Sequence, residues 1–313
     1  MNTKSCVIIP YYKSGHLVLD VLRKIPSIID FVYIVDDNSP IPIPDCSFSE
    51  FDFEVIIVKH ETNKGVGGAM KTGFRKALEN EEIRYFYKVD SDDQMDLSQI
   101  FKLQDHLISE TCDFVKGNRL YDITVIKRMP FVRRFGNLAL SFITKMCTGY
   151  WGVQDPTNGY FGISREALMQ LDLDRLHDSY FFETSLLGEL FLNDSVISSV
   201  KMPPIYKNEV SNMNVFLIPF EFLPKLIAIF FRRVYYKYFL FDLNIGSIYL
   251  FLSVLLFVFG SSFGFYHYYK NLNLGLTTPA GTVIIFALAI LISFNLFLSW
   301  LDFDTKNYPR KNP

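Results

Sequence analysis

The chain has 313 residues, of which 50% are hydrophobic and 16% aromatic, with a mean hydropathy of +0.18 and a formal net charge of −2. These values exclude intrinsic disorder, collagen-like repeats and a small disulfide scaffold, and the balanced charge predicts no nucleic-acid partner. The four cysteines are scattered without a CxxC pair, which is typical of free thiols in a reducing compartment.

Short apolar runs alternate with stretches of helical spacing up to about residue 212. The predicted strands are Ser5–Ile9, Phe31–Val35, Glu54–Val58 and Tyr85–Val89. The predicted helices are His16–Lys24, Val66–Leu78 and Leu97–Ser109. This alternation predicts an α/β fold with a mostly parallel sheet covered on both faces, whose ligands bind at the carboxyl ends of the strands.

Polar and aromatic residues follow the first two predicted strands. The first strand leads into Pro10-Tyr11-Tyr12, where an aromatic ring could stack on a nucleobase or simply pack in the core. The second leads into Asp36-Asp37, where a carboxylate could accept hydrogen bonds from a nucleoside or form an Asx turn before Pro40. Further on, Asn63–Ala69 is glycine-rich at a predicted helix start, which favours either an anion site or a plain tight turn.

Acidic residues follow the predicted strand Tyr85–Val89. Asp90 and Asp92 are two positions apart just past the strand, and Gln94 follows them. Oxygen donors in this arrangement suit a divalent cation that neutralises the charge of a departing diphosphate, so Mg²⁺ or Mn²⁺ is the expected cofactor. The alternative is an acidic turn or helix cap before Leu97.

The composition changes near residue 215. Val215–Leu240 mixes large apolar and basic residues, and Pro219 and Pro224 are expected to break it into one or two interfacial helices; the alternative is a helix packed on the soluble domain. Leu243–Tyr266 and Pro279–Trp300 hold no charged residue. At about 1.5 Å per residue each reaches about 33–36 Å, enough to cross a bilayer.

Basic residues lie before the first apolar segment and after the second, while the linker between them holds one lysine, Lys270. The predicted arrangement is therefore a multi-pass protein of the inner (cytoplasmic) membrane with both termini in the cytoplasm. The predicted divisions are a catalytic domain at 1–212, interfacial helices at 213–242, a membrane hairpin at 243–301 with spans 243–266 and 279–300, and a tail at 302–313.

The motifs together resemble glycosyltransferase family 2, whose nucleotide-sugar-binding domain has the GT-A fold. They are IPxY, VDDNS, NxGxGGA and VDSDDQ, in that order after successive strands. The segment Asp155–Tyr160 resembles the D-x-x-[ST]-G-F block of dolichyl-phosphate mannose synthase and related polyprenyl-phosphate glycosyltransferases, and Lys116–Arg119 resembles their GSR block. Asn158 and Tyr160 depart from that pattern, and the late R-x-x-G-x-S-K block is missing.

The resemblance implies roles for individual residues. Nucleotide contacts are implied for Pro10, Tyr12, Asp37 and Asp90, and metal contacts for Asp90, Asp92 and Gln94. Catalytic roles are implied for Asp92, for Arg119 and Arg134 toward the acceptor phosphate, and for Asp155 beside the donor sugar.

For several side chains near these positions, two interpretations of their role remain open. Arg133 could replace Arg134, and the run that includes Lys127 and Arg128 could instead be a solvated or lipid-facing surface. Glu183 could contact the sugar or the acceptor, or be structural.

The function implied is a membrane-anchored inverting transferase that moves a sugar from a nucleotide-sugar donor to a polyprenyl phosphate, undecaprenyl or dolichyl. The alternatives are transfer to a lipid-linked glycan and a non-catalytic nucleotide-binding membrane scaffold. The expected partners are the donor, the lipid phosphate and the membrane, and the sequence is compatible with a homo-oligomer.

Overall fold

The computed structural model describes residues 3–45, 47–109, 111–119, 131–156, 158–202 and 218–310, with the backbone alone at 131–133, 137 and 218–220. The chain divides into two compact units, Met1–Phe230 with Pro309–Pro313, and Phe231–Tyr308. The basic residues Lys127 and Arg128 lie outside the described residues, as does the side chain of Arg133.

The first unit is built on a sheet with the order β3-β2-β1-β4-β6-β5-β7 among the described residues. Its strands are β1 (Lys4–Tyr11), β2 (Phe31–Asp36), β3 (Glu54–Lys59), β4 (Ile83–Lys88), β5 (Phe114–Asn118), β6 (Phe161–Ser164) and β7 (Ile197–Lys201). β1 pairs in parallel with β2 and β4, whereas β6 is antiparallel to both β4 and β5. The four predicted strands and the mostly parallel sheet are confirmed.

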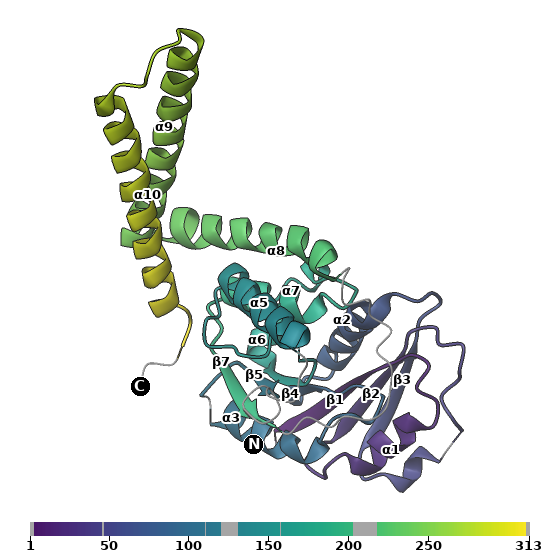
Figure 1. Cartoon of the computed structure of the whole chain (residues 1–313). Coiled ribbons are helices and arrows are strands. Elements are labelled where there is room, and N and C mark those ends of the chain that lie inside the picture. The colour runs from purple at the N-terminus through teal and green to yellow at the C-terminus, as the bar shows by residue number, and fades with distance from the viewer. Residues whose placement is uncertain are drawn as a thin grey trace. The chain divides into compact units, whose positions relative to one another are not determined.

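Helices cover both faces of this sheet (Figure 1). They are α1 (Leu17–Lys24), α2 (Gly65–Leu78), α3 (Ile100–Ile108), α5 (Phe131–Thr148), α6 (Arg165–Met169) and α7 (Phe182–Leu192). One face carries an apolar core cluster, where α1 and α3 pack against residues such as Val7 and Ile9. The other face receives α2, whose Gly73 lies against Ile8 and Val35. The predicted helix Leu97–Ser109 begins as a 3-10 turn, Leu97–Gln99, before α3.

α8 (Ile218–Tyr235) is one continuous helix, so of the one or two helices expected here the structure has one, and the expected break at Pro224 is wrong. Pro219 falls in the first turn, where no hydrogen bond is lost, but Pro224 lies inside the helix and costs about 3 kcal/mol. Burial of Phe222 and Leu226 offsets this, at roughly 1.5–3 kcal/mol for each side chain.

α8 is apolar on more than one face. Phe222 and Leu226 pack in the first unit with Cys147 and Phe181, as the packed-helix alternative requires. Leu223 and Ile227 remain 46% and 45% exposed, which is what a helix lying on a lipid surface would show. The packed-helix alternative therefore holds for the face that carries Phe222 and Leu226, and contact of the exposed face with lipid stays a prediction.

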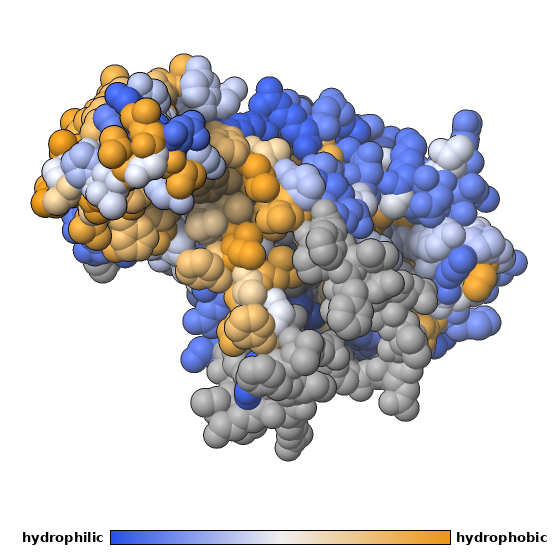
Figure 2. Space-filling view, turned by 45° about the horizontal axis from the view of Figure 1, so that its top comes forward, coloured by the Kyte–Doolittle hydropathy of each residue, from blue (hydrophilic) through white to orange (hydrophobic). Residues whose placement is uncertain are grey.

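The second unit contains a π-helical turn, η4 (Tyr236–Phe241), and the helices α9 (Ile245–Asn273) and α10 (Ala280–Lys306). α9 and α10 lie side by side as a hairpin (Figure 1) and are long and apolar enough to cross a membrane. Figure 2 shows mostly hydrophobic residues over this hairpin. Ser253 and Ser293 each donate a hydrogen bond to the other's carbonyl oxygen, at 2.9 and 2.8 Å.

A buried ion pair joins the end of α8 to the last turns of α10 in the second unit. The Arg233 guanidinium donates to the Asp304 carboxylate at 2.7 Å, and the Tyr238 hydroxyl donates to the same oxygen at 2.6 Å. Arg233 and Asp304 are 1% and 0% exposed, so each charged group has the other as its partner in place of water. It fixes the end of α8 and the η4 turn to α10.

Candidate active site

Asp37, at the end of β2, anchors the start of α2. Its carboxylate accepts hydrogen bonds from the backbone N–H groups of Lys64 at 2.8 Å and Gly65 at 2.7 Å. His60 Nδ1 lies 2.7 Å from the same carboxylate. The Asx turn is made by the preceding residue, because the Asp36 carboxylate accepts from the Ser39 N–H at 2.8 Å.

The two tyrosines after β1 have different environments. Tyr11 is the packing tyrosine: it is fully buried, and the carbonyl oxygens of Ile41 and Pro42, at 3.0 and 2.9 Å, share the single proton of its hydroxyl. Tyr12 is 45% exposed, with the Lys13 ammonium 5.0 Å from its ring centre. The exposed ring of Tyr12 is therefore the one available for stacking.

The glycines at the start of α2 make room for the chain itself. The backbone N–H groups of Gly67 and Gly68 donate to the carbonyl of Asp178 at 2.7 and 3.2 Å. A methyl group on Gly67 would lie 2.1 Å from the His177 carbonyl oxygen. Because Asp37 and Asp178 occupy the N–H groups at this helix start, the structure favours the tight-turn reading over an anion site.

The acidic loop after β4 separates into structural and half-exposed members. Asp93 is buried with φ 58° and holds the Lys24 ammonium at 2.6 and 2.7 Å. Asp96 caps the next turn by accepting from the Ser98 N–H. Asp92 accepts from the Gln94 N–H at 3.1 Å and remains half-buried, as does Asp90. The helix-cap alternative is thus satisfied by Asp96, not by Asp90 or Asp92.

Asp90 is paired with a buried lysine that sequence reasoning missed. Lys88 is 1% exposed, and its ammonium lies 2.7 Å from Asp90 Oδ1 and 3.2 Å from Glu183 Oε1. Burial alone would lower the pKa of Lys88, but the two carboxylates raise it above its usual value. Gly159 backs this cluster, since a methyl group there would lie 2.5 Å from the Lys88 Nζ. The signal in the sequence is a lysine inside the otherwise apolar predicted strand Tyr85–Val89.

A second buried lysine, Lys116 on β5, lies in the segment that resembles the GSR block. It is 1% exposed, and its ammonium donates to the Asn158 carbonyl. Burial lowers the pKa of Lys116 to about 8, against the opposing effect of Glu183 and Asp155. Asn158 in turn donates to the Gly117 carbonyl at 2.8 Å, which ties the D-x-x-[ST]-G-F-like block to β5.

Arg119 and Asp155 form a two-pronged ion pair. Arg119 Nε lies 2.9 Å from Asp155 Oδ2, and Nη2 lies 3.2 Å from Oδ1. Asp155 is 3% exposed, whereas the Arg119 side chain is 45% exposed. The structure therefore joins these two predicted residues directly. Arg134 lies at the start of α5 and is half-buried.

The residues expected to hold a divalent ion fit a site in which substrate phosphates would supply the remaining ligands. Among the described residues, no group of three or more His, Cys, Asp or Glu side chains is placed to hold a metal alone. Mg²⁺ is commonly held by one or two carboxylates together with substrate phosphates. Asp90 and Asp92 match that donor set, because both are half-exposed carboxylates just past β4, and Asp90 pairs with Lys88 through one oxygen, Oδ1.

Comparison with known proteins adds four findings. A family model described as Glycosyl transferase family 2 matches residues 6–172. A UDP-N-acetylglucosamine--dolichyl-phosphate N-acetylglucosaminyltransferase of Methanococcus voltae is 40% identical over 119 residues, which are 38% of this chain and 46% of that protein. The uncharacterized protein MJ1222 of Methanocaldococcus jannaschii is 29% identical over 175 residues, 56% of this chain and 70% of that protein. S. aureus TarS 1–349 aligns over 98% of this chain and 93% of that chain, at 16% identity and a TM-score of 0.43.

The chain spans less than half the length of the M. voltae relative. The family match covers the residues that form most of the sheet, and it confirms the expected GT-A-like α/β fold.

Proposed function

The chain belongs to glycosyltransferase family 2, and from this we propose that it is a membrane-anchored inverting enzyme that transfers a sugar from a nucleotide donor to a polyprenyl phosphate. The proposal of a polyprenyl phosphate acceptor rests on the similarity to a relative that is named for transfer to dolichyl phosphate. The apolar hairpin of α9 and α10 supports it, because an enzyme with a lipid substrate gains from a membrane anchor.

The donor would bind at the carboxyl ends of β1, β2 and β4. Pro10 and Tyr12 would contact the nucleoside, with the exposed Tyr12 ring stacking on the base. Asp37 would act from a fixed position, since its carboxylate is held by the Lys64 and Gly65 N–H groups. A divalent ion held by Asp90, Asp92 and Gln94 would neutralise charge on the departing diphosphate.

The acceptor phosphate would bind on the side of Arg119 and Arg134. Asp155 holds the Arg119 guanidinium in a two-pronged pair, which fixes its orientation while nearly half of the side chain stays exposed. A fixed guanidinium binds phosphate oxygens well because its donors lie in one plane. Asp155 would thus serve the acceptor through Arg119 as well as lie beside the donor sugar.

The reaction would be one displacement at the anomeric carbon. A phosphate monoester has its second pKa at about 6, so the attacking oxygen is already anionic near neutral pH and needs no strong base. That oxygen forms the new bond to the anomeric carbon while the bond to the diphosphate oxygen breaks, and the nucleoside diphosphate leaves with the electron pair. Arg119 and Arg134 would overcome the repulsion between the two phosphate groups.

The active face would lie in the cytoplasm, together with both termini. The basic residues before the first apolar helix and after the second support this orientation. Soluble nucleotide sugars would then reach the site directly.

A donor panel tests the proposal. The full chain in vesicles would be given radiolabelled UDP- and GDP-sugars with either polyprenyl phosphate or a lipid-linked glycan as acceptor. We expect one donor to yield labelled polyprenyl-phosphate sugar that depends on the added polyprenyl phosphate, and none from Asp92→Asn. If label appears only on the lipid-linked glycan, then that glycan, not polyprenyl phosphate, is the acceptor. If no donor yields product, the result favours a non-catalytic nucleotide-binding membrane scaffold.

A further inference from the structure

α10 presents a stripe of side chains spaced alternately by three and four positions. Its members are Ile285, Leu288, Ile292, Asn295, Ser299, Asp302 and Lys306, all exposed except Ser299, which is half-buried. The contact seam of a helix pair uses this spacing, because side chains of each helix then fit between those of the other.

The hairpin uses a different face of α10. Ala289 lies against Gly260 of α9, and Ser293 exchanges hydrogen bonds with Ser253 of α9. Both are buried, while the stripe lies roughly a third of a turn away around the helix at about 100° per residue. α9 therefore leaves the stripe open.

The stripe becomes polar toward the C-terminal end of α10. Asn295 lies in the segment that holds no charged residue. Its backbone carbonyl accepts from the Ser299 hydroxyl, and within the described residues its side-chain amide has no hydrogen bond. An exposed amide at such a position is costly in lipid unless another helix supplies the partner. Asp302 follows about 10 Å further along the axis and pairs with Lys306 at 2.7 Å.

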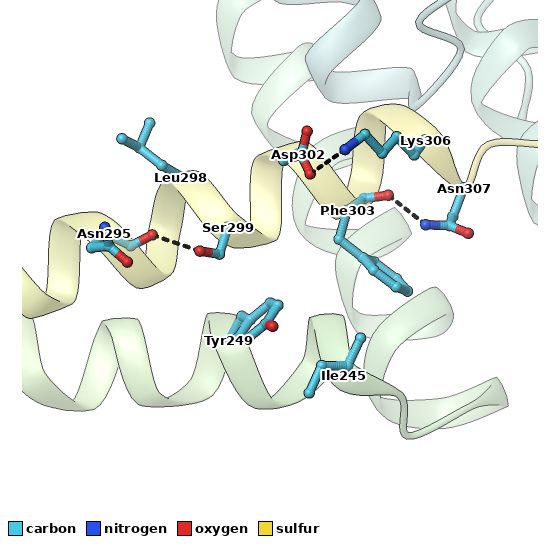
Figure 3. A pocket seen from close by; sticks show the side chains of 9 residues that line it. All are labelled: Ile245, Tyr249, Asn295, Leu298, Ser299, Asp302, Phe303, Lys306 and Asn307. Atoms are coloured by element: carbon cyan, nitrogen blue, oxygen red, sulfur yellow. Dashed lines mark hydrogen bonds and ion pairs between the residues drawn. The ribbon is translucent and has the colours of Figure 1, made fainter.

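A pocket of about 430 Å³ borders the polar end of the stripe (Figure 3). α10 lines it with Asn295, Ser299, Asp302 and Lys306, and α9 adds Ile245 and Tyr249. The lining therefore combines a hydrogen-bonding amide with one acidic and one basic side chain.

We propose that a second copy of this chain covers the stripe, in a parallel two-fold dimer formed through α10. The surface is self-complementary: an amide both donates and accepts, so Asn295 can pair with its own copy, and Asp302 and Lys306 can pair reciprocally across the axis. Ile285 and Ile292 alternate with Leu288, an order that favours two-stranded helix pairs. The inference goes beyond the proposed chemistry and rests on α9 and α10 spanning the membrane.

Association of the full chain in lipid vesicles, measured by energy transfer between labelled copies, tests the dimer. Asn295→Leu should raise the dissociation constant about 3- to 30-fold, the range expected for an interhelical hydrogen bond. The matched control is Phe294→Leu, a 59% exposed position off the stripe, which should leave the constant within about twofold.

Charge exchange gives a sharper test. Chains with Asp302→Lys carry two cations on the stripe, and chains with Lys306→Asp carry two anions. Each should associate at least about threefold more weakly with itself, and a mixture of the two should restore the wild-type constant. If Asp302 and Lys306 pair only within their own chain, mixing the two variants should not restore the wild-type dissociation constant.

Three results would overturn the dimer. They are an unchanged constant in Asn295→Leu, mixed charge variants that associate no better than each alone, and a monomeric wild type that retains a phospholipid which Asn295→Leu loses. Release of the chain from membranes by alkaline carbonate would show that α9 and α10 do not span the membrane, which the dimer requires. The proposed sugar transfer is tested separately by the donor panel.

Discussion

Side chains of alternating charge connect the two ends of the candidate site. In order they are Arg119, Asp155, Lys116, Glu183, Lys88 and Asp90. Lys88 is paired with two carboxylates, which raises its pKa, whereas Lys116 donates to a neutral carbonyl and burial lowers its pKa. The expected acceptor-binding arginine and the expected metal-binding aspartate thus belong to one electrostatic network.

Asp92→Asn should lower the rate by orders of magnitude and leave the fold intact, because Asp92 is a half-buried loop residue that would lose an anionic donor. Chelation should do the same to the wild type, reversibly with Mg²⁺ or Mn²⁺. Product formation by the full chain measures both. Asp174→Asn, at a surface position whose side chain is 89% exposed, is the control. Full activity in chelator would contradict the metal role.

Arg119→Ala should lower kcat/KM for polyprenyl phosphate about 10- to 150-fold, since a charge-assisted contact is worth roughly 1.5–3 kcal/mol. Donor binding, measured by calorimetry, should stay near wild type. Arg175→Ala is the control, because Arg175 forms an exposed pair with Asp172 that is worth under about 1 kcal/mol. Weakened donor binding with unchanged acceptor dependence would move Arg119 to the diphosphate side.

Lys116 makes stability depend on pH. Its pKa is about 8 in the folded chain and about 10.4 in an unfolded one, so between these values the unfolded chain binds more protons and stability rises with pH. Below pH 8 both states are protonated, and the burial penalty, on the order of 3 kcal/mol, is fully present. Lys116→Met should flatten the rise of the thermal midpoint between pH 8 and pH 10. Equal pH profiles for both chains would argue against a lowered pKa.

The candidate site was predictable only where residue order carries the signal. Asp90 and Asp92 are recognisable because they follow a strand, and Asp37 because it follows another. The Arg119–Asp155 and Lys88–Glu183 pairs join residues that are far apart along the chain, so only the fold reveals them. The metal and nucleotide roles stay predictions, as does the role of Arg134.

Among the elements, α2 shows how a sequence feature can have a structural cause. Gly67→Ala should destabilise the chain by about 1–3 kcal/mol, because the added methyl meets the backbone of His177. Gly136→Ala is the matched control: its methyl would meet nothing within 4 Å in α5, so stability should rise by about 0.5–1 kcal/mol. Thermal unfolding compares the two. Equal effects would mean that the close approach of His177 is not needed.

Regular periodicity predicted the elements well. The four strands and the first two helices begin and end within about two residues of their expected bounds. The antiparallel direction of β6 was not predictable, because a short buried strand carries no sign of its direction. The continuity of α8 through Pro224 was also missed, since tertiary burial of its neighbours outweighs the local cost.

At the scale of the whole molecule, the orientation in the membrane can be measured directly. A reporter fused after Pro313 should be active only in the cytoplasm, because the basic residues flank the outer ends of the two apolar helices. A fusion within the linker near Lys270 is the control and should report the opposite side. A signal from the far side at Pro313 would place the active face away from soluble donors.

The buried pair of Arg233 and Asp304 also sets an order of biosynthesis. Ribosomes make Arg233 before α9 and α10, and Asp304 only near the end of α10, so the pair can close only after both helices have been synthesised. Until then Arg233 lacks the partner that makes its burial tolerable. A nascent chain stalled before residue 304 should therefore leave the end of α8 open to proteases, and completion of α10 would act as a built-in check that the hairpin has been assembled.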